Sequence, residues 1–379
     1  MKITKITAVP ISFRIPEGGN VTLGIGRAVK RDAVLVRVDT DEGITGWGEA
    51  HHGRCPGAIA KLIDTTLADI VVGMDAGDIV GVWSRVYRMQ LASHGLGSGS
   101  AMALSGLDIA LWDIKGKALG QPLYRILGGA PRPSPAYAGG ISLGWQDSAS
   151  LAEEALRYVA QGYRALKLRV GDSPARDIPR VRAVREAVGD DIAIMVDANT
   201  GYTLGDVRRV MPLYEELAVE WLEEPFPPHD LRDYREARAL GTVPLAAGEN
   251  HVMRYDFMQM LEEGAITVPQ PDVSKTGGLT ETLRIAALVS TVKMNCNPHT
   301  SLTSINMAAS IHLLCAIDNP GYYEGDCAPH NPFRDRVGGT VGTLDANGCV
   351  WPTQGPGLGL EIDEEFIAAH PLIDGPCYV

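Results

Sequence analysis

Two patterns of hydrophobic and polar residues follow one another along the first part of the chain. Residues 3–13, 33–40 and 44–50 show the β-rich alternation that is typical of strands, and the turn residues DEG occupy 41–43. Residues 59–71, 78–92 and 101–120 carry apolar residues three and four positions apart, which predicts helices. Strands followed by helices predict a compact α+β domain at the N-terminus.

A different pattern begins near residues 128–131, where the sequence reads GGAP. Beyond this point, short apolar runs alternate with amphipathic stretches, which predicts strands that alternate with helices. Eight such units are typical of a (β/α)-barrel. A doubly wound dinucleotide-binding sheet is the rival, but no GxGxxG motif follows any run. The runs occupy residues 135–142, 165–170, 192–199, 219–225, 244–250, 265–272, 294–299 and 321–326.

Composition narrows the classes of function. The chain has 379 residues and a formal net charge of −12, which argues against a nucleic-acid or anionic-membrane partner because both favour basic surfaces. Its six cysteines form no CxxC pair or zinc spacing and indicate reduced thiols. The chain shows neither a signal-peptide pattern nor an apolar stretch of ~20 residues, so we expect a cytoplasmic protein.

An ionisable residue stands at the end of nearly every predicted strand of the barrel. Because the carboxyl ends of barrel strands meet at one mouth, we expect these side chains to form one site. From strand to strand the positions are 23 to 30 residues apart, which is one strand–helix unit. They are Lys167, Arg169, Asp197, Glu223, Glu249, Asp272, His299 and Glu324.

Three carboxylates of this set, Asp197, Glu223 and Glu249, end successive strands. Carboxylates in contact repel strongly unless a cation lies between them. A hard divalent ion with oxygen ligands and open positions resolves this repulsion, so the pattern predicts a Mg²⁺ site. The alternative for any one of them is a helix cap or an ion pair with an arginine.

The remaining residues suggest acid–base chemistry next to this metal. Asp272 can accept from one imidazole nitrogen of His299 and leave the other as a base. Lys167 and Arg169 lie two apart on one strand and face the barrel interior, where they suit a substrate carboxylate or a lysine base of lowered pKa. The alternative is that both are interior ion-pair partners of the metal carboxylates.

Two further residues point into the same mouth. Asn199 follows Asp197 by two positions and faces the same way, so it is a candidate hydrogen-bond partner of the substrate. Glu324 ends the last strand, where it either contacts the substrate or supports another side chain.

These residues and their surroundings resemble the enolase superfamily and, within it, the mandelate racemase subgroup. The resemblance covers essentially the whole chain, and the set of motifs in this order is more specific than any one motif. The C-terminal motifs HNPFRD and GPGLGLEI resemble those of sugar-acid members. The other motifs are GITGWGEA, LSGLDIALWDIKGK, KLR at 167–169, MVDAN, WLEEP, AAGEN, QPDVSKTGG and PHTS.

The resemblance implies an α/β fold in which an N-terminal α+β capping domain, residues 1–127, covers a (β/α)₇β modified TIM barrel, residues 128–349. Residues 350–379 are expected to pack back on the capping domain. The resemblance also implies one Mg²⁺ per subunit, bound by Asp197, Glu223 and Glu249. It further implies a small carboxylate substrate and an assembly of identical subunits, either a dimer or an octamer.

The resemblance also implies roles for individual residues. Asp272 stands where muconate-lactonising and dipeptide-epimerising relatives place a lysine base, and its pairing with His299 favours the mandelate racemase subgroup. Glu324 matches the residue that donates a hydrogen bond to the substrate carboxylate. Loops near residues 16–28 and 50–56 match the capping loops that set specificity, so His51, His52 and Arg54 are candidate substrate contacts.

One residue departs from the subgroup pattern. The second cation of the KLR motif is Arg169, where the subgroup commonly has a lysine base, and a guanidinium is a poor base because it is essentially always protonated. Racemisation needs a base on each face of the carbon, whereas elimination of water can proceed with His299 alone. Arg169 therefore favours a dehydratase, unless Lys167 has a pKa lowered by Arg169 and serves as the second base.

Three functions follow in order of preference. The first is a sugar-acid dehydratase that removes the proton next to the carboxylate and then eliminates water. The second is an isomerase with the same metal and enolate, namely a racemase, an epimerase or a lactone cycloisomerase. The third, a non-catalytic metal- or ligand-binding barrel, is the least favoured because such a protein should have lost some of these side chains.

Overall fold

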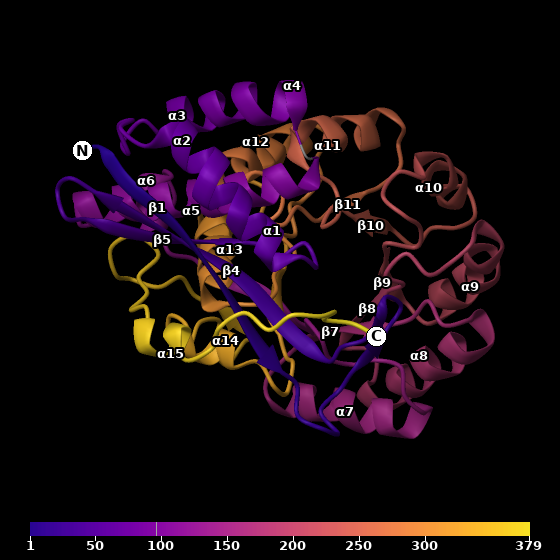
Figure 1. Cartoon of the computed structure of the whole chain (residues 1–379). Coiled ribbons are helices and arrows are strands. Elements are labelled where there is room, and N and C mark those ends of the chain that lie inside the picture. Colours follow the sequence, from indigo (N-terminus) through magenta and orange to yellow (C-terminus); the bar gives the residue numbers. More distant parts are fainter. Residues whose placement is uncertain (96) are drawn as a thin grey trace.

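The N-terminal strands form an antiparallel sheet in the computed structural model, which describes residues 1–95 and 97–379. Its strand order is β1 (Ile3–Arg14), β4 (Lys30–Thr40) and β5 (Thr45–Ala50). The long helix α5 (Ser98–Leu119) packs against this sheet (Figure 1). A methyl group at Gly48 would overlap the carbonyl oxygen of Gly106, so the glycines of GITGWGEA permit the close approach of β5 to α5.

The other helices of this domain are the ones predicted from the apolar periodicity. Residues 56–71 form one helical segment with a π-helical middle, and residues 79–94 form a second of the same kind. Their elements are α1 (Pro56–Lys61), η1 (Leu62–Leu67), α2 (Ala68–Val71), α3 (Ile79–Val86), η2 (Tyr87–Leu91) and α4 (Ala92–His94).

A curled parallel sheet follows, with the strand order β11–β10–β9–β8–β7–β6–β12. The predicted run 294–299 forms isolated bridges instead of a strand: His299 pairs with Asp272, and Cys296 pairs with Pro320. These bridges join β11 to the segment that leads into β12. The strands are β6 (Ser134–Gly139), β7 (Ala165–Arg169), β8 (Ala193–Asp197), β9 (Val219–Glu223), β10 (Leu245–Ala247), β11 (Val268–Pro269) and β12 (Tyr323–Asp326).

Seven helices connect these strands and surround the sheet (Figure 1). Large buried side chains such as Tyr137, Met195 and Trp221 fill the inside of the barrel, as a closed barrel of this size requires. The predicted barrel-type α/β fold is therefore confirmed. The helices are α7 (Ser148–Ala160), α8 (Pro174–Val188), α9 (Leu204–Glu216), α10 (Leu231–Arg238), α11 (Met253–Glu262), α12 (Gly278–Ser290) and α13 (Ser304–Ala316).

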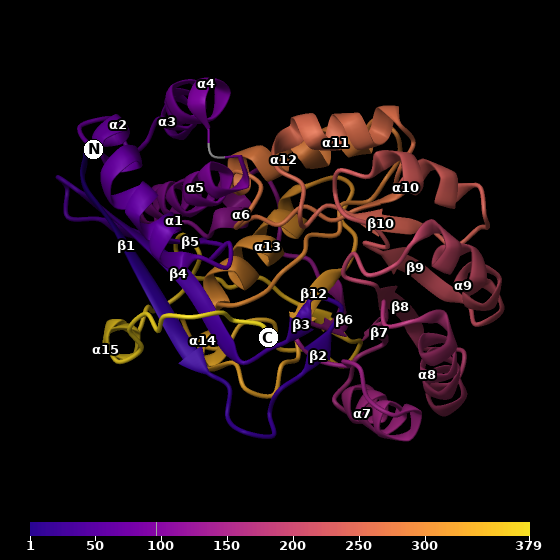
Figure 2. The ribbon, with the colours of Figure 1, turned by 45° about the vertical axis from the view of Figure 1, so that its right-hand side comes forward.

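The C-terminal segment returns to the N-terminal domain. After β13 (Cys349–Val350), which pairs with β6, it contacts the short helix α6 (Leu123–Ile126) and strand β1. It then passes α15 (Glu364–Ala368), crosses near β4 and ends beside β2 (Thr22–Leu23) and β3 (Gly26–Arg27), as Figure 2 shows in yellow. The remaining helix is α14 (Pro332–Arg336).

Two further observations bear on the expectations from composition. All six cysteines are free. None of the helices formed by residues 1–95 and 97–379 is long and apolar enough to cross a membrane.

Candidate active site

The predicted strand-end residues lie at the carboxyl ends of the barrel strands. Lys167 and Arg169 belong to β7, Asp197 ends β8, and Glu223 ends β9. Glu249, Asp272 and His299 follow β10, β11 and the bridge-forming run, and Glu324 lies in β12. All of these side chains are buried except that of Glu249, which is 14% exposed.

The three predicted metal carboxylates are close enough to influence one another. Asp197 and Glu223 are register partners on β8 and β9. Lys167 Nζ lies 2.7 Å from Oε1 of Glu223 and 3.7 Å from Oδ2 of Asp197. Burial raises the pKa of Glu223 to about 7 against the opposing charge of Lys167, and Asp197 and Glu249 act in the same direction as burial.

This donor set fits a hard divalent cation. The carboxylates come from three neighbouring strands and supply oxygen atoms, which Mg²⁺ prefers. One more buried oxygen at the same mouth, Asn199 Oδ1, has no hydrogen-bond partner within the described residues. In this structure, lysine and arginine side chains neutralise the carboxylates.

Lys167 does not match the expectation of a lowered pKa. Its side chain is fully buried, and Nζ lies 2.8 Å from Glu324 Oε1 as well as 2.7 Å from Glu223 Oε1. Burial and the charge of Arg169 lower its pKa, but the carboxylates of Glu223 and Glu324 outweigh them and raise it well above the usual value. The prediction was wrong because these carboxylates lie on other strands. Lys167 is instead an interior ion-pair partner, which was the alternative for this residue.

Arg169 lies against Asp197, one of the predicted metal carboxylates. Its guanidinium donates to Asp197 Oδ2 and to the carbonyl oxygen of Gly140, while Nε has no partner among the residues that the structure describes. Its pKa is raised because Asp197 and the other carboxylates outweigh burial. Arg169 is therefore a fixed positive charge and not a base.

The structure brings His299 and Asp272 together. Asp272 Oδ2 accepts from Nδ1 of His299 at 2.6 Å, and Asp272 Oδ1 accepts from the backbone N–H of Ser274 at 2.7 Å. Nε2 of His299 lies 2.7 Å from Glu249 Oε2. Burial lowers the pKa of His299, but Glu249, Glu324 and the hydrogen bond to Asp272 together raise it to about 10.

Glu324 is an acceptor in this arrangement and not the donor that the resemblance implied. Burial favours its protonated form, but Lys167, His299 and Arg169 lower its pKa to about 2. Its Oε1 accepts from the N–H of Gly140 at 3.2 Å, in addition to the ion pair with Lys167. A carboxylate that is ionised offers no proton to a second carboxylate.

A cavity of about 430 Å³, the site cavity, opens between the barrel mouth and the capping loops. Its size lies in the range of small-molecule sites. All the predicted contacts from the capping loops line it, together with two of the barrel cations. The lining residues that matter here are His51, His52, Arg54, Asn199, Arg169, Lys275, Glu224, Glu249, His299 and Tyr378.

The two capping histidines are neutral donors. Their rings stack with centroids 4.3 Å apart, and burial is the first cause that lowers both pKa values, that of His52 to about 3. Nδ1 of His51 accepts from Gly53 N–H at 3.1 Å, and Nδ1 of His52 accepts from Arg54 N–H at 3.0 Å. A neutral imidazole whose Nδ1 accepts carries its proton on Nε2, so neither histidine offers a base at Nε2.

Asn199, which we predicted as a substrate contact, serves Asp197 first. Its backbone N–H donates to Asp197 Oδ1 at 2.8 Å and its Nδ2 donates to Oδ2 at 3.1 Å. Only Oδ1 of Asn199 is left to accept a hydrogen bond in the site cavity.

Three ionisable residues that line the site cavity were not predicted from the sequence. Lys275, whose Nζ lies 3.4 Å from Glu249 Oε1, comes three positions after Asp272 in the motif QPDVSKTGG, and this spacing could have identified it. Glu224 directly follows Glu223, yet it also reaches the cavity because its backbone has φ 37°. Tyr378 comes from the C-terminal end, and nothing in the sequence pattern placed it at the mouth.

A larger cavity of about 550 Å³ lies between α7 and the segment near residue 341. None of the strand-end residues of the predicted site lines it. The chemistry therefore belongs to the site cavity.

Two family models match the chain. The model described as "Mandelate racemase / muconate lactonizing enzyme, N-terminal domain" matches residues 5–128. The model described as "Enolase C-terminal domain-like" matches residues 150–366, which is more than half of the chain.

Curated relatives match over most of their length. D-galactarolactone cycloisomerase of Agrobacterium fabrum is 34% identical over 91% of this chain and 93% of its own. Arabinonate dehydratase of Saccharolobus solfataricus is 31% identical over 87% and 88%. D-galactonate dehydratase of Xanthomonas oryzae pv. oryzae is 32% identical over 88% and 90%.

Solved structures agree with these relatives. A member of the enolase superfamily from Polaromonas sp. JS666 is 55% identical, with a TM-score of 0.98 and full coverage of both chains. A protein from Bordetella bronchiseptica RB50 complexed with 2-oxoglutarate/phosphate is 37% identical, with a TM-score of 0.92 and 99% coverage of each chain. A racemase from Streptomyces coelicolor A3(2) with bound magnesium is 29% identical, with a TM-score of 0.88 and coverage of 98% and 100%.

A capped barrel with carboxylates and a histidine–aspartate pair at its mouth, together with these relatives, defines an enzyme of the lyase or isomerase class. The chain belongs to the enolase superfamily, in the mandelate racemase and muconate lactonizing enzyme family. Members of this family hold magnesium, so the family depends on Mg²⁺.

Proposed function

We propose that the protein is a Mg²⁺-dependent dehydratase of a sugar acid or a related hydroxy-carboxylate. The observation that carries this proposal is that His299, oriented by Asp272, faces the same cavity as Arg169. A base and a permanently charged guanidinium suit elimination better than inversion of a carbon centre, which needs two bases. Dehydratases of sugar acids among the relatives support the same choice.

One Mg²⁺ per subunit is held by Asp197, Glu223 and Glu249 in this proposal. When bound, the ion supplies the positive charge that neutralises the substrate carboxylate and the ene-diolate formed from it. The three carboxylates are buried or nearly so, which keeps water away from the charges they balance. Their strand-end positions fix their spacing.

His299 moves the protons. Its Nε2 takes the proton from the carbon next to the carboxylate, and the electron pair left by the broken C–H bond enters the ene-diolate. The bond from the neighbouring carbon to its hydroxyl then breaks, and His299 returns its proton to that hydroxyl, which leaves as water. The enol product rearranges to a 2-keto-3-deoxy acid. Asp272 keeps the proton of His299 on Nδ1, so Nε2 is the nitrogen that exchanges protons with the substrate.

The surrounding cations stabilise the charge that develops. Arg169 and Lys275 both line the cavity, and neither loses its charge near neutral pH because carboxylates raise both pKa values against burial. The Nε2–H group of His51 is a donor for hydroxyl or carboxylate oxygens of the substrate, because Nδ1 of this ring accepts from Gly53. Lys167 acts beneath them by holding Glu223 and Glu324 in place.

An isomerase is the second candidate, because a relative 34% identical to the chain is a lactone cycloisomerase. A cycloisomerase would form the same ene-diolate and differ only in the group that leaves. Membership of an enzyme family removes the reason for our third hypothesis, a non-catalytic binding barrel.

The activity is tested by incubating the protein and Mg²⁺ with a panel of aldonic acids, aldaric acids and their lactones. We expect a 2-keto-3-deoxy acid from at least one open-chain acid, with loss of the signal on removal of Mg²⁺ by EDTA and in His299→Asn. A keto product formed only from lactones would show that the protein is a cycloisomerase and not a dehydratase. No product from any acid or lactone would remove both.

We also propose that the protein is a homo-oligomer, either a dimer or an octamer, in the cytoplasm. The free state of all six cysteines supports a reducing compartment. Light scattering on the purified protein tests the oligomer, and a monomer at micromolar concentration would contradict it.

A further inference from the structure

The last residues of the chain, 373–379, cross the capping domain and form part of the wall of the site cavity. We call them the C-terminal strap. Val29 N–H donates to the carbonyl oxygen of Cys377 at 2.9 Å, and Val379 N–H donates to that of Arg27 at 3.0 Å. Between these two bonds, the side chain of Tyr378 lines the cavity. Figures 1 and 2 agree that the C-terminus ends in front of the barrel strands.

Buried ionic contacts hold the strap in place. Lys30 Nζ donates to the carbonyl oxygens of Ile373 and Gly375 and lies 3.2 Å from Asp32 Oδ2. Ile373 N–H donates to the hydroxyl of Ser12 at 3.0 Å. Since Lys30 is almost fully buried, these bonds are shielded from water and fix the path of the strap.

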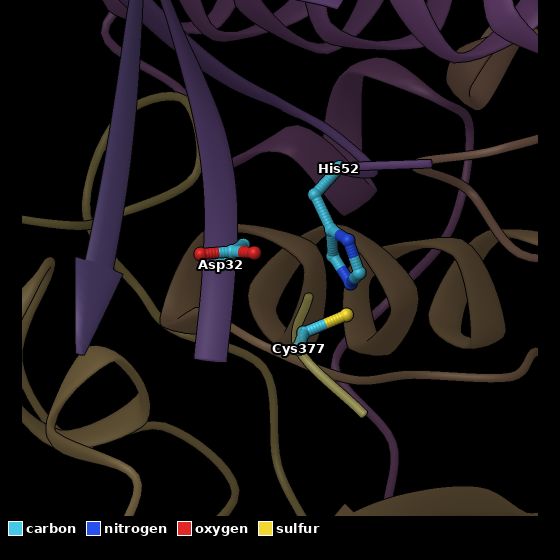
Figure 3. A group of neighbouring side chains, drawn as sticks. All are labelled: Asp32, His52 and Cys377. Carbon is cyan, nitrogen blue, oxygen red and sulfur yellow. The ribbon is translucent and has the colours of Figure 1, made fainter. Parts of the chain in front are cut away.

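Asp32 of β4, His52 of the capping loop and Cys377 of the strap lie close together (Figure 3), and their potential ligand atoms are within 4.8 Å of one another. A metal-binding imidazole nitrogen must be unprotonated, and the other nitrogen then carries the proton and donates it. Nδ1 of His52 instead accepts from the backbone N–H of Arg54, so the proton is on Nε2, the nitrogen that points to Cys377 in Figure 3. The cluster is therefore not arranged to bind a metal, but it places the capping loop next to the strap.

Arg54 follows His52 by two positions on the same capping loop. Its Cζ lies 5.2 Å from the centroid of the Tyr378 ring, which places the guanidinium over the aromatic face. Both side chains line the cavity. No carboxylate in residues 1–95 and 97–379 forms an ion pair with Arg54, whereas the other arginine in the cavity, Arg169, is paired with Asp197.

Tyr378 lies near both arginines of the cavity, Arg54 and Arg169. Burial raises the pKa of the Tyr378 hydroxyl, and the charges of Arg31, Arg169 and Arg54 act against burial. Tyr378 is therefore within electrostatic reach of Arg169, at the metal carboxylates, and of Arg54, on the capping loop. The cavity has paired cations at its barrel side and an unpaired arginine at its capping side.

We propose that Arg54, positioned by Tyr378 of the C-terminal strap, binds a second carboxylate of the substrate, so that the enzyme prefers a dicarboxylic acid over its monocarboxylic counterpart. A guanidinium binds a carboxylate through two parallel hydrogen bonds, which makes it selective for this group over a hydroxymethyl group. The proposal rests on the proposed function for the site of the first carboxylate, at the metal. Tyr378 is a positioning residue, and Arg54 determines specificity.

The experiment compares 2-oxoglutarate with 2-oxopentanoate, which has the same five-carbon chain but lacks the distal carboxylate. Calorimetric titration in the presence of Mg²⁺ gives the affinity of each without any turnover. We expect 2-oxoglutarate to bind at least 10-fold more tightly to the wild-type protein. We expect Arg54→Gln to reduce this preference to less than threefold by weakening 2-oxoglutarate far more than 2-oxopentanoate. Equal binding of the two acids by the wild-type protein, or binding of neither, would overturn the proposal.

Two further variants separate the role of Tyr378 from a structural one. Tyr378→Phe keeps the aromatic face and should keep the preference for 2-oxoglutarate. In Tyr378→Leu, the logarithm of the ratio of the two affinities should fall to half of its wild-type value or less. Arg209→Gln removes an exposed arginine of α9 and should change nothing. If Tyr378→Phe and Tyr378→Leu behave alike, the positioning role of the ring is wrong.

A panel of matched aldonic and aldaric acids tests the same preference in catalysis. We expect a kcat/KM at least 10-fold higher for the aldaric member of the best pair, and a difference of less than threefold in Arg54→Gln. A higher kcat/KM for the aldonic member in the wild-type protein would overturn the proposal. Failure of the proposed dehydratase would appear separately, as a preference for 2-oxoglutarate in the titration without any keto product from the acids.

Discussion

Nε2 of His299 lies 2.7 Å from Oε2 of Glu249, on the opposite side of the ring from Asp272. Carboxylates therefore contact both ring nitrogens, and the imidazole holds its proton with a pKa of about 10. His299 can accept a proton from the substrate only when no carboxylate occupies its Nε2. Because Glu249 is also one of the proposed metal ligands, the residue that occupies Nε2 here is one that metal binding would engage. This relationship links the metal site to the proton-transfer site.

The first prediction concerns the two adjacent glutamates of the WLEEP motif. We expect Glu223→Gln to lower the affinity for Mg²⁺ at least 10-fold, because a neutral amide replaces a charged ligand. Glu224→Gln is the matched control and should lower it less than threefold, since Glu224 already accepts from Asn250 Nδ2 at 2.8 Å. Calorimetric titration with MgCl₂ measures both. A larger loss of affinity in Glu224→Gln than in Glu223→Gln would show that Glu224, and not Glu223, is the metal ligand.

The second prediction concerns the aspartate that orients the base. Asp272→Asn removes the charge that holds the proton on Nδ1 of His299, so we expect exchange of the α-proton to fall by about 10²-fold or more. The KM for the substrate should change less than threefold, because Asp272 does not line the cavity. Asp230→Asn at the start of α10 makes the same chemical change where asparagine caps equally well, and it should have no effect. Equal rates in the two variants would show that the dyad has no catalytic role.

The third prediction tests the contact between β5 and α5. Gly48→Ala should lower the free energy of unfolding by about 1–3 kcal/mol, because its methyl group would overlap the carbonyl oxygen of Gly106. Gly205→Ala, where the nearest atom outside the helix is Thr203 Oγ1 at 3.6 Å, should be neutral or stabilising. Denaturant titrations compare the two. A neutral Gly48→Ala would mean that the sheet and helix can separate at no cost.

The fourth prediction concerns the stability of the protein in acid. His312 is buried, and burial lowers its pKa from 6.5 to about 4. Between these two values the unfolded chain binds a proton that the folded protein does not, so stability falls as the pH falls from 6.5 towards 4. The contribution reaches roughly 3 kcal/mol.

We therefore expect His312→Gln to reduce the slope of unfolding free energy against pH between 6.5 and 4. His229→Gln, at a histidine on the surface, is the control and should keep the wild-type slope. Unfolding at a series of pH values provides the measurement. Identical slopes in all three proteins would contradict the assignment to His312.

The barrel could be predicted from the sequence because its elements are local. Each apolar run and the helix after it carry their own periodicity, and the ends of parallel strands face one mouth in any such barrel. This is why the spacing of Asp197, Glu223 and Glu249 along the chain is enough to group them. The run 294–299 was predicted as a strand but forms only two bridges, because its partners at 272 and 320 are short irregular segments.

The parts of the site that could not be predicted depend on contacts between distant segments. Burial lowers the pKa of Lys167, and Glu223 and Glu324, the latter 157 positions away, raise it; burial and Lys167 in turn act in opposite directions on the pKa of Glu324. Tyr378 reaches the mouth only because the strap crosses the capping domain. No periodicity records such contacts, so the sequence located the residues of the site but not their protonation states.

The most direct test of the central claim follows the α-proton in D₂O. The protein, Mg²⁺ and an open-chain sugar acid that binds are incubated in D₂O, and both product and recovered substrate are analysed by NMR. We expect a 2-keto-3-deoxy acid, with any deuterium in recovered substrate on one face of the α-carbon, and neither signal in His299→Asn. Recovery of the substrate as two deuterated epimers without a keto acid would contradict it.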